Sequence, residues 1–235
     1  MSLGFSRSFR FGLYAIAVFI LGASMYSLAK PALSGSVPSV SAIDHVKGGT
    51  SAPVTLIEYS DFQCPACSAF EPVVENILTT YGDNVQLVYR HFPLYTIHAN
   101  AEEAAFASEA AAQQGKFWEM HELLFDRQAD WENLVDATAM FVAYADLLEL
   151  DTEQFTSDLT SDAVRDRVKI DVNSANAAGI SATPTFYLNG SALSFPKGQS
   201  PEAYLKAQID AALATLAPVA EQTTPDMTTD TTVTP

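Results

Sequence analysis

The sequence contains few cysteines and few basic residues. Its 235 residues include two cysteines, four histidines, 12 lysines and arginines, and 28 aspartates and glutamates, so the formal net charge is −16. A chain this acidic repels the phosphates of nucleic acids and anionic lipids, and we expect neither as a partner. The cysteines and the scattered histidines do not provide the closely spaced ligand pairs of a structural zinc site. We therefore expect no nucleic acid, no metal and no cofactor.

The two cysteines, Cys64 and Cys67, are separated by only two residues. They follow a strand-like run, 54–59, and open a helix-like run, 68–78. At a helix start, unpaired backbone N–H groups and the helix dipole stabilise a thiolate, so Cys64 should be acidic. Cys67 lies one turn further on, where it can attack a mixed disulfide formed by Cys64. A structural disulfide over so short a gap would remove little chain entropy. The pair therefore indicates a redox site.

The N-terminus has the pattern of a membrane-targeting segment. Residues 1–10 contain two arginines and no acid, and the 19 residues 11–29 are uncharged and mostly apolar. About 20 apolar residues span a bilayer, whereas the apolar part of a cleaved signal peptide has about 7–15. We therefore expect a cytoplasmic segment at 1–10, an uncleaved signal anchor at 11–29 and an extracytoplasmic remainder. A signal peptide cleaved after 27–29 is the alternative. Disulfides persist outside the cytoplasm in either case.

The rest of the chain is interpreted as a tether, one domain and a tail. Residues 30–51 are rich in Pro, Ser and Gly and are expected to form a tether. Residues 218–235 are dominated by Thr, Pro and acids and are expected to be disordered. The intervening 52–217 is long enough for one domain. Its patterns predict a long helical region at 98–172 and a final helix at 201–216. They predict strands at 54–59, 85–90, 185–188 and 192–195.

Four runs of the sequence carry a resemblance to a known family. They are EYSDFQCPAC at 58–67, YRHFPL at 89–94, GKFWEMHELLF at 115–125 and GISATPTF at 179–186. Together, and in this order, they resemble the thioredoxin superfamily, and within it the DsbA-like branch. The resemblance implies an α/β fold, namely a thioredoxin fold with an inserted all-helical domain at about 98–172. The chain is similar to membrane-anchored bacterial members, because the apolar segment precedes the domain directly.

The resemblance also implies roles for individual residues. Cys64 would be the attacked sulfur and Cys67 the resolving one. Thr183 and Pro184 would share a cis bond packed against the cysteines, with the backbone of Thr183 offered to an extended substrate. Glu58 would lie beneath the cysteines and exchange a proton with Cys67. A solvent-facing Glu58 remains the alternative, because strand alternation does not fix which face it occupies.

The dipeptide between the cysteines departs from the best-known strong oxidase of the family. Here it is Pro65 and Ala66, whereas that oxidase carries Pro-His, whose His helps to stabilise the thiolate. Ala66 has no such side chain, so a less oxidising potential is expected. Asp61 and His91 lie in the first two of the four runs and are interpreted as structural and not catalytic.

Three functions remain open. The first is an exported, monomeric thiol–disulfide oxidase that donates disulfides to cysteine-containing exported client proteins and is recharged by a quinone-linked membrane partner. The second is a reductase or isomerase of the same fold. Isomerases of the superfamily usually dimerise through an added N-terminal domain, and 30–51 is too short for one. The third is a non-catalytic interaction module with vestigial cysteines.

Overall fold

The computed structural model describes residues 40–216. The predicted cytoplasmic segment 1–10, the signal anchor 11–29 and the tail 218–235 lie outside these residues, as does the first part of the predicted tether, 30–39. Within the described part of the chain, no helix is both long and apolar enough to cross a membrane.

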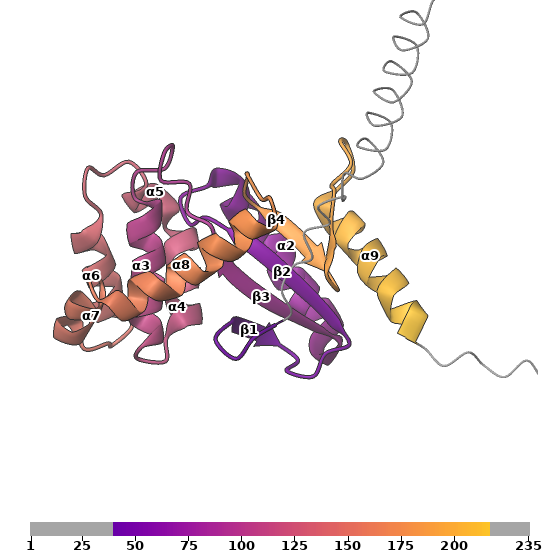
Figure 1. The fold of residues 1–235 in the computed structure, drawn as a ribbon, viewed down its shortest axis with the longest axis horizontal. Coiled ribbons are helices and arrows are strands. Elements are labelled where there is room, and N and C mark those ends of the chain that lie inside the picture. The colour runs from indigo at the N-terminus through magenta and orange to yellow at the C-terminus, as the bar shows by residue number, and fades with distance from the viewer. Residues whose placement is uncertain (1–39, 217–235) are drawn as a thin grey trace, which may run out of the picture. The chain divides into compact units, whose positions relative to one another are not determined.

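A mixed sheet of five strands, in the order β1-β3-β2-β4-β5, forms the centre of the described domain (Figure 1). β2 and β3 run parallel, with Val54 opposite Val85, and the other neighbouring strands are antiparallel. A parallel pair needs a crossover, which is α2 (Pro65–Tyr81) followed by the short helix η1 (Gly82–Asn84). The order of the predicted elements, strand 54–59, helix 68–78 and strand 85–90, favours such a parallel βαβ unit, and the structure confirms it. The strands are β1 (His45–Gly48), β2 (Val54–Ser60), β3 (Val85–His91), β4 (Thr185–Leu188) and β5 (Ser191–Ala192).

The predicted tether 30–51 is wrong in its last part, because this part contains β1. β1 pairs antiparallel with β3 and covers an edge that would otherwise expose unpaired backbone groups. Gly48 adopts a φ of +96°, and a Cβ atom at Gly49 would lie 2.5 Å from the carbonyl oxygen of Asp83. The glycines that suggested a flexible linker are thus required by a left-handed conformation and a close backbone contact.

The chain between β3 and β4 is helical, as predicted. It begins at Ala101 and its last helix, α8, continues to Ala177, slightly beyond the predicted 98–172. In Figure 1, α3 to α7 gather beside the sheet, whereas α8 runs from that group back along the sheet. The helices are α3 (Ala101–Ala112), α4 (Phe117–Asp126), α5 (Gln128–Trp131), α6 (Thr138–Leu147), α7 (Thr152–Asp158) and α8 (Asp162–Ala177).

The two faces of the sheet are covered by different helices. Val54 and Leu56 of β2 pack in a core with α2 and with α9 (Pro201–Leu216). Ile57 and Tyr59 point to the other face and pack near α8. Because side chains alternate along a strand, Glu58 shares the α2 face with Leu56.

One predicted strand is shorter than expected. The returning strand at 192–195 is limited to β5, Ser191–Ala192, although the N–H of Leu193 still donates to the carbonyl oxygen of Phe186 at 2.8 Å. Phe195 instead turns towards Phe70, with ring centroids 5.1 Å apart. Packing of this aromatic ring against α2 therefore replaces further strand pairing.

Candidate functional site

Cys64 immediately precedes α2, which starts at Pro65, three residues before the predicted helix start at 68. It is the N-cap residue, with φ −74° and ψ 120°, and Pro65 occupies the first helical position. Proline fits there because its missing N–H would have no helical partner. Cys64 is 7% exposed and Cys67 is fully buried. Both are free thiols, so the structure corresponds to the reduced site.

The surroundings give the two thiols opposite properties. The pKa of Cys64 is lowered to about 5, and the largest cause is a hydrogen bond from the Cys67 side chain. Hydrogen bonds from Thr183 and from the backbone N–H groups of Cys67 and Ala66 lower the pKa further, whereas burial raises it. Burial raises the pKa of Cys67 far above its ordinary value, and the hydrogen bond to Cys64 and the charge of Glu58 raise it further. At neutral pH, Cys64 is a thiolate and Cys67 a neutral thiol. Ala66 contributes through its backbone and not through its side chain.

Thr183 and Pro184 lie against Cys64, although they are far away in the sequence. The bond between them is cis, as the resemblance implies. The Cys64 Sγ lies 3.6 Å from the carbonyl oxygen of Thr183 and can donate to it as a thiol. Both residues are partly exposed and immediately precede β4. The structure therefore brings backbone hydrogen-bonding groups next to the more accessible sulfur.

Glu58 is buried and not solvent-facing, so the open alternative for this residue is wrong. It is 1% exposed, and neither carboxylate oxygen has a hydrogen-bond partner of proper geometry within the described residues. Burial raises the pKa of Glu58 to about 7; the hydroxyl of Ser60 opposes this shift and the charge of Cys64 adds to it. A carboxyl group that titrates near neutrality therefore lies on the α2 face of the sheet, close enough to Cys67 to influence its charge.

No pattern in the sequence indicated another acid near the site, the half-buried Glu71 on α2. Burial, assisted by the charges of Glu58 and Glu75, raises the pKa of Glu71 to about 9. Glu71 also lines a cavity of about 520 Å³ together with Glu75, Glu122 and Asp126. Only the helical spacing of Glu71 relative to Cys67, one turn later on α2, could have placed it near the site.

Asp61 supports the loop before α2, which agrees with its predicted structural role. Its carboxylate accepts hydrogen bonds from the backbone N–H groups of Gln63 and Leu94 and pairs with His98 Nδ1 at 2.7 Å. Gln128, which no motif indicated, donates through its side-chain amide to the carbonyl oxygen of Cys64 at 3.2 Å. The same amide donates to the carbonyl oxygen of Phe62, in the loop before α2, at 2.7 Å. The helical insert thus holds the active-site loop from one side.

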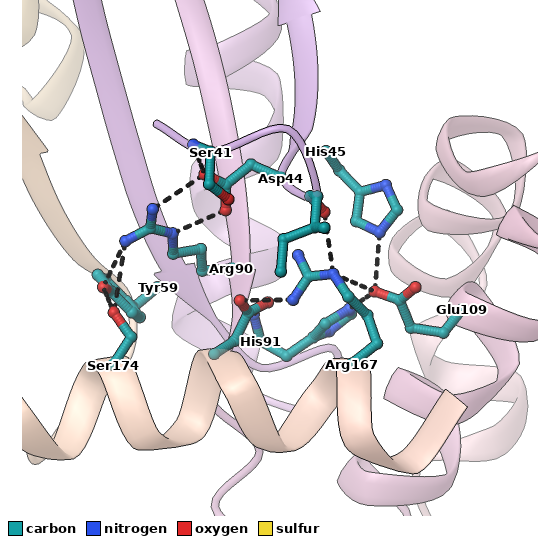
Figure 2. Close-up of polar contacts among 11 residues, drawn as sticks. Ser41, Asp44, His45, Tyr59, Arg90, His91, Glu109, Arg167 and Ser174 are labelled. Atoms are coloured by element: carbon teal, nitrogen blue, oxygen red, sulfur yellow. Dashed lines mark hydrogen bonds and ion pairs between the residues drawn. The ribbon is translucent and has the colours of Figure 1, made fainter. Parts of the chain in front are cut away.

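A second polar network ties the chain before β1 to β3 and α8. Arg90 donates to both carboxylate oxygens of Asp44, each at 3.0 Å, and to the hydroxyl of Tyr59 at 2.9 Å (Figure 2). Tyr59 in turn lies 2.6 Å from the Ser174 hydroxyl on α8. His91 belongs to the neighbouring part of this network, because its backbone N–H donates to a carboxylate of α8. These contacts support its predicted structural role.

Comparison with known proteins agrees with this geometry. The family model described as "Thioredoxin" matches residues 41–211. BdbD from Bacillus subtilis is 25% identical, with a TM-score of 0.64 over 78% of this chain and 96% of that protein. Wolbachia pipientis alpha-DsbA1 is 25% identical, with a TM-score of 0.65 over 78% of this chain and 99% of that protein.

Curated relatives carry a different name. The Na(+)/H(+) antiporter NhaA 3 of Salinispora tropica is 44% identical over 147 residues, which are 63% of this chain and 22% of the antiporter. NhaA 1 of Salinispora arenicola is 43% identical over the same shares. The chain therefore spans about a fifth of the length of these relatives, and their name describes proteins that are mostly composed of other sequence.

The matched region covers most of the chain and includes the cysteine pair, the cis proline and the helical insert. The chain therefore belongs to the thioredoxin family, with the α/β thioredoxin fold and the inserted helices of the DsbA-type thiol–disulfide oxidoreductases that it resembles.

Proposed function

We propose that the protein is an exported thiol–disulfide oxidoreductase that donates disulfides to cysteine-containing client proteins. A client thiolate attacks Cys64 of the Cys64–Cys67 disulfide, and Cys67 leaves and takes up a proton. The second client thiolate then attacks the client sulfur of the mixed disulfide and releases the Cys64 thiolate. The client loses two electrons and gains a disulfide, while the protein becomes a dithiol.

The acidity of Cys64 is the observation that supports this direction. The pKa of Cys64 is about 5, compared with 9.0 for an unperturbed thiol. At pH 7, this difference stabilises the reduced form by about 3 kcal/mol, which raises the reduction potential by about 60 mV. A good leaving thiolate favours transfer of the disulfide to the client. Reduction of clients, the alternative, would be favoured by a less acidic Cys64.

Thr183 and Pro184 are proposed to position the client. An extended client segment could pair with the backbone of Thr183, in the manner of strand addition, and so bring its sulfur towards Cys64. The carbonyl oxygen of Thr183, 3.6 Å from Cys64 Sγ, supports this arrangement. Glu58 is proposed to supply the proton that Cys67 needs, because its pKa of about 7 allows it to give and take protons at neutral pH.

The cellular setting is part of the same proposal. The apolar segment 11–29 would anchor the protein in the cell membrane, with the described domain on the extracytoplasmic side. A quinone-linked membrane partner would reoxidise the dithiol. Both rest on the sequence pattern and on the need of an oxidase for an electron acceptor. Fractionation of cells that express the full chain, followed by trapping of the Cys67→Ala variant on its partners, tests them.

The redox equilibrium of the cysteine pair in the full chain against glutathione tests the direction of exchange. A potential clearly above about −270 mV, displaced towards the strong-oxidant end at about −120 mV, is expected for a disulfide donor whose dipeptide lacks the histidine. A value near −270 mV, the thioredoxin end of the scale, would overturn the oxidase proposal in favour of a reductase. Cys64→Ser should abolish oxidation of a reduced client. Failure of the unmodified protein itself to oxidise the client, together with partner binding that Cys64→Ser leaves intact, would favour the non-catalytic interaction module.

A further inference from the structure

Two histidines and a buried glutamate meet on the side of β3 that faces the helical insert. His45 lies on β1, His91 ends β3, and Glu109 lies on α3. His45 Nε2 is 2.7 Å and His91 Nε2 is 2.9 Å from the same carboxylate oxygen of Glu109 (Figure 2). Within the described residues, these three side chains form a group whose ligand atoms all lie within 4.8 Å of one another.

The geometry points to a divalent-metal site of the Zn²⁺ class, with His45 Nε2, His91 Nε2 and the Glu109 carboxylate as its protein ligands. Two imidazoles and one carboxylate are a common ligand set of zinc sites that keep a fourth position for water. Calcium and magnesium prefer oxygen ligands, so this nitrogen-rich set selects against them. The inference is independent of the proposed redox function.

The donor atoms need to move only slightly to hold a metal. Ligand bonds of about 2.0–2.1 Å in a tetrahedron place donor atoms roughly 3.3 Å apart. The two nitrogen–oxygen distances of 2.7 and 2.9 Å would therefore have to open by about half an ångström. In the metal-free form, each of these contacts carries a proton on Nε2. A metal would take the place of those protons on Nε2, and each neutral ring would carry its proton on Nδ1 instead.

The ligand side chains are held in place by their neighbours. The ring of His45 stacks on Phe117, with centroids 3.4 Å apart and planes at 4°. The ring of His91 packs edge-on against Tyr89, with centroids 5.3 Å apart. Glu109 is 2% exposed. Hydrogen bonds to both histidines hold its carboxylate in place.

Access and charge set the limits of the site. The side chain of His45 is 17% exposed, so a metal and one water can reach the group from the β1 edge. Arg167 opposes a cation, because its Nε lies 3.8 Å from the Glu109 carboxylate (Figure 2). Arg167 is also tied to Asp171 at 2.6 Å. Removal of the positive charge, as in Arg167→Gln, should therefore tighten metal binding.

Calorimetric titration of Zn²⁺ into the full, tag-free chain tests the inference. Cys64 and Cys67 are first oxidised to their disulfide, so that no thiolate competes for the metal. We expect one Zn²⁺ per chain, and at least tenfold weaker binding by His45→Asn. His98→Asn is the matched control. His98 is equally exposed, at 17%, and pairs with a buried carboxylate at the same 2.7 Å, yet its variant should bind Zn²⁺ like the unmodified chain.

The absence of Zn²⁺ binding by the unmodified chain would overturn the inference, and so would undiminished binding by His45→Asn. A second measurement needs no variant and therefore no assumption about folding. Co²⁺ bound by two nitrogens and an oxygen in a tetrahedral site gives intense ligand-field bands. Bands of tetrahedral intensity that Zn²⁺ abolishes would support the site, and weak octahedral bands would contradict it.

Discussion

Replacement of Cys67 by alanine is expected to raise the pKa of the Cys64 thiol from about 5 to roughly 6–7. The Cys67 side chain makes the largest contribution to the low pKa of Cys64, through a hydrogen bond to its sulfur. Alanine removes the donor. A hydrogen bond to a charged group contributes about 1.5–3 kcal/mol, and one pKa unit corresponds to about 1.36 kcal/mol. The loss of the bond should therefore cost about one to two units. The contributions of Thr183 and of the backbone remain, so the pKa should stay below the ordinary value.

The ultraviolet absorbance of the thiolate as a function of pH measures this change, and the rate of alkylation provides a second readout. Cys67→Ser is the matched control, because the serine hydroxyl keeps a donor at the same position and should preserve most of the low pKa. An identical midpoint for Cys67→Ala and the unmodified protein would refute the hydrogen bond as the main cause. A midpoint near about 8.5 in the unmodified protein would refute the acidic thiolate itself.

Three further changes test the site and its support. Burial raises the pKa of Glu58 from 4.5 to about 7. Between these two pH values, the folded protein keeps a proton that the unfolded chain releases. The free energy of unfolding should therefore fall by about 3 kcal/mol as the pH rises from 4.5 to about 7. Urea unfolding at several pH values should show that Glu58→Gln removes this loss, whereas an unchanged pH dependence would contradict the burial argument. Gln128→Met removes the amide that donates to the carbonyl oxygens of Phe62 and Cys64, of which the second still accepts from the N–H of Ser68. The loss of the partner at Phe62 should lower the free energy of unfolding in urea by about 1–3 kcal/mol, and an unchanged free energy would contradict this role of the amide. Gly49→Ala would place a Cβ atom 2.5 Å from the backbone of Asp83, and the free energy of unfolding in urea should fall by about 1–3 kcal/mol. An unchanged free energy of unfolding would mean that the backbone shifts freely at this point.

Much of the fold follows from local patterns in the sequence. The strands at 54–59 and 85–90 are runs rich in β-forming residues on either side of a helix, and such a sequence favours a parallel pair. β1 was missed because its four residues contain only one apolar side chain, Val46, and lie among glycines. Pairing with β3 makes these residues a strand, although the sequence of β1 itself does not indicate one. Short edge strands are generally defined by their neighbours and not by their own composition.

Part of the site was also predictable from local sequence and part was not. The spacing of Cys64 and Cys67 alone indicates redox chemistry, and the cis bond at Pro184 was predicted from the resemblance. The face occupied by Glu58 required the packing of Leu56 against α2, which alternation alone does not supply. His45 and Glu109 are 64 residues apart, and no motif joins them. Their approach depends on β1 pairing with β3, the one strand pairing that the sequence did not predict.

The charge on Cys64 couples the two steps of the proposed exchange. While Cys64 is a thiolate, its charge adds to the burial that raises the pKa of Glu58 to about 7. In the first step, Glu58 gives its proton to Cys67; in the mixed disulfide Cys64 carries no charge, so the pKa of Glu58 is lower and its carboxylate stays ionised. In the second step, the second client thiolate releases the Cys64 thiolate, whose charge raises the pKa of Glu58 again and favours the return of its proton. A buried carboxyl group without a stable partner destabilises the fold, but its protonation can respond to a single neighbouring charge.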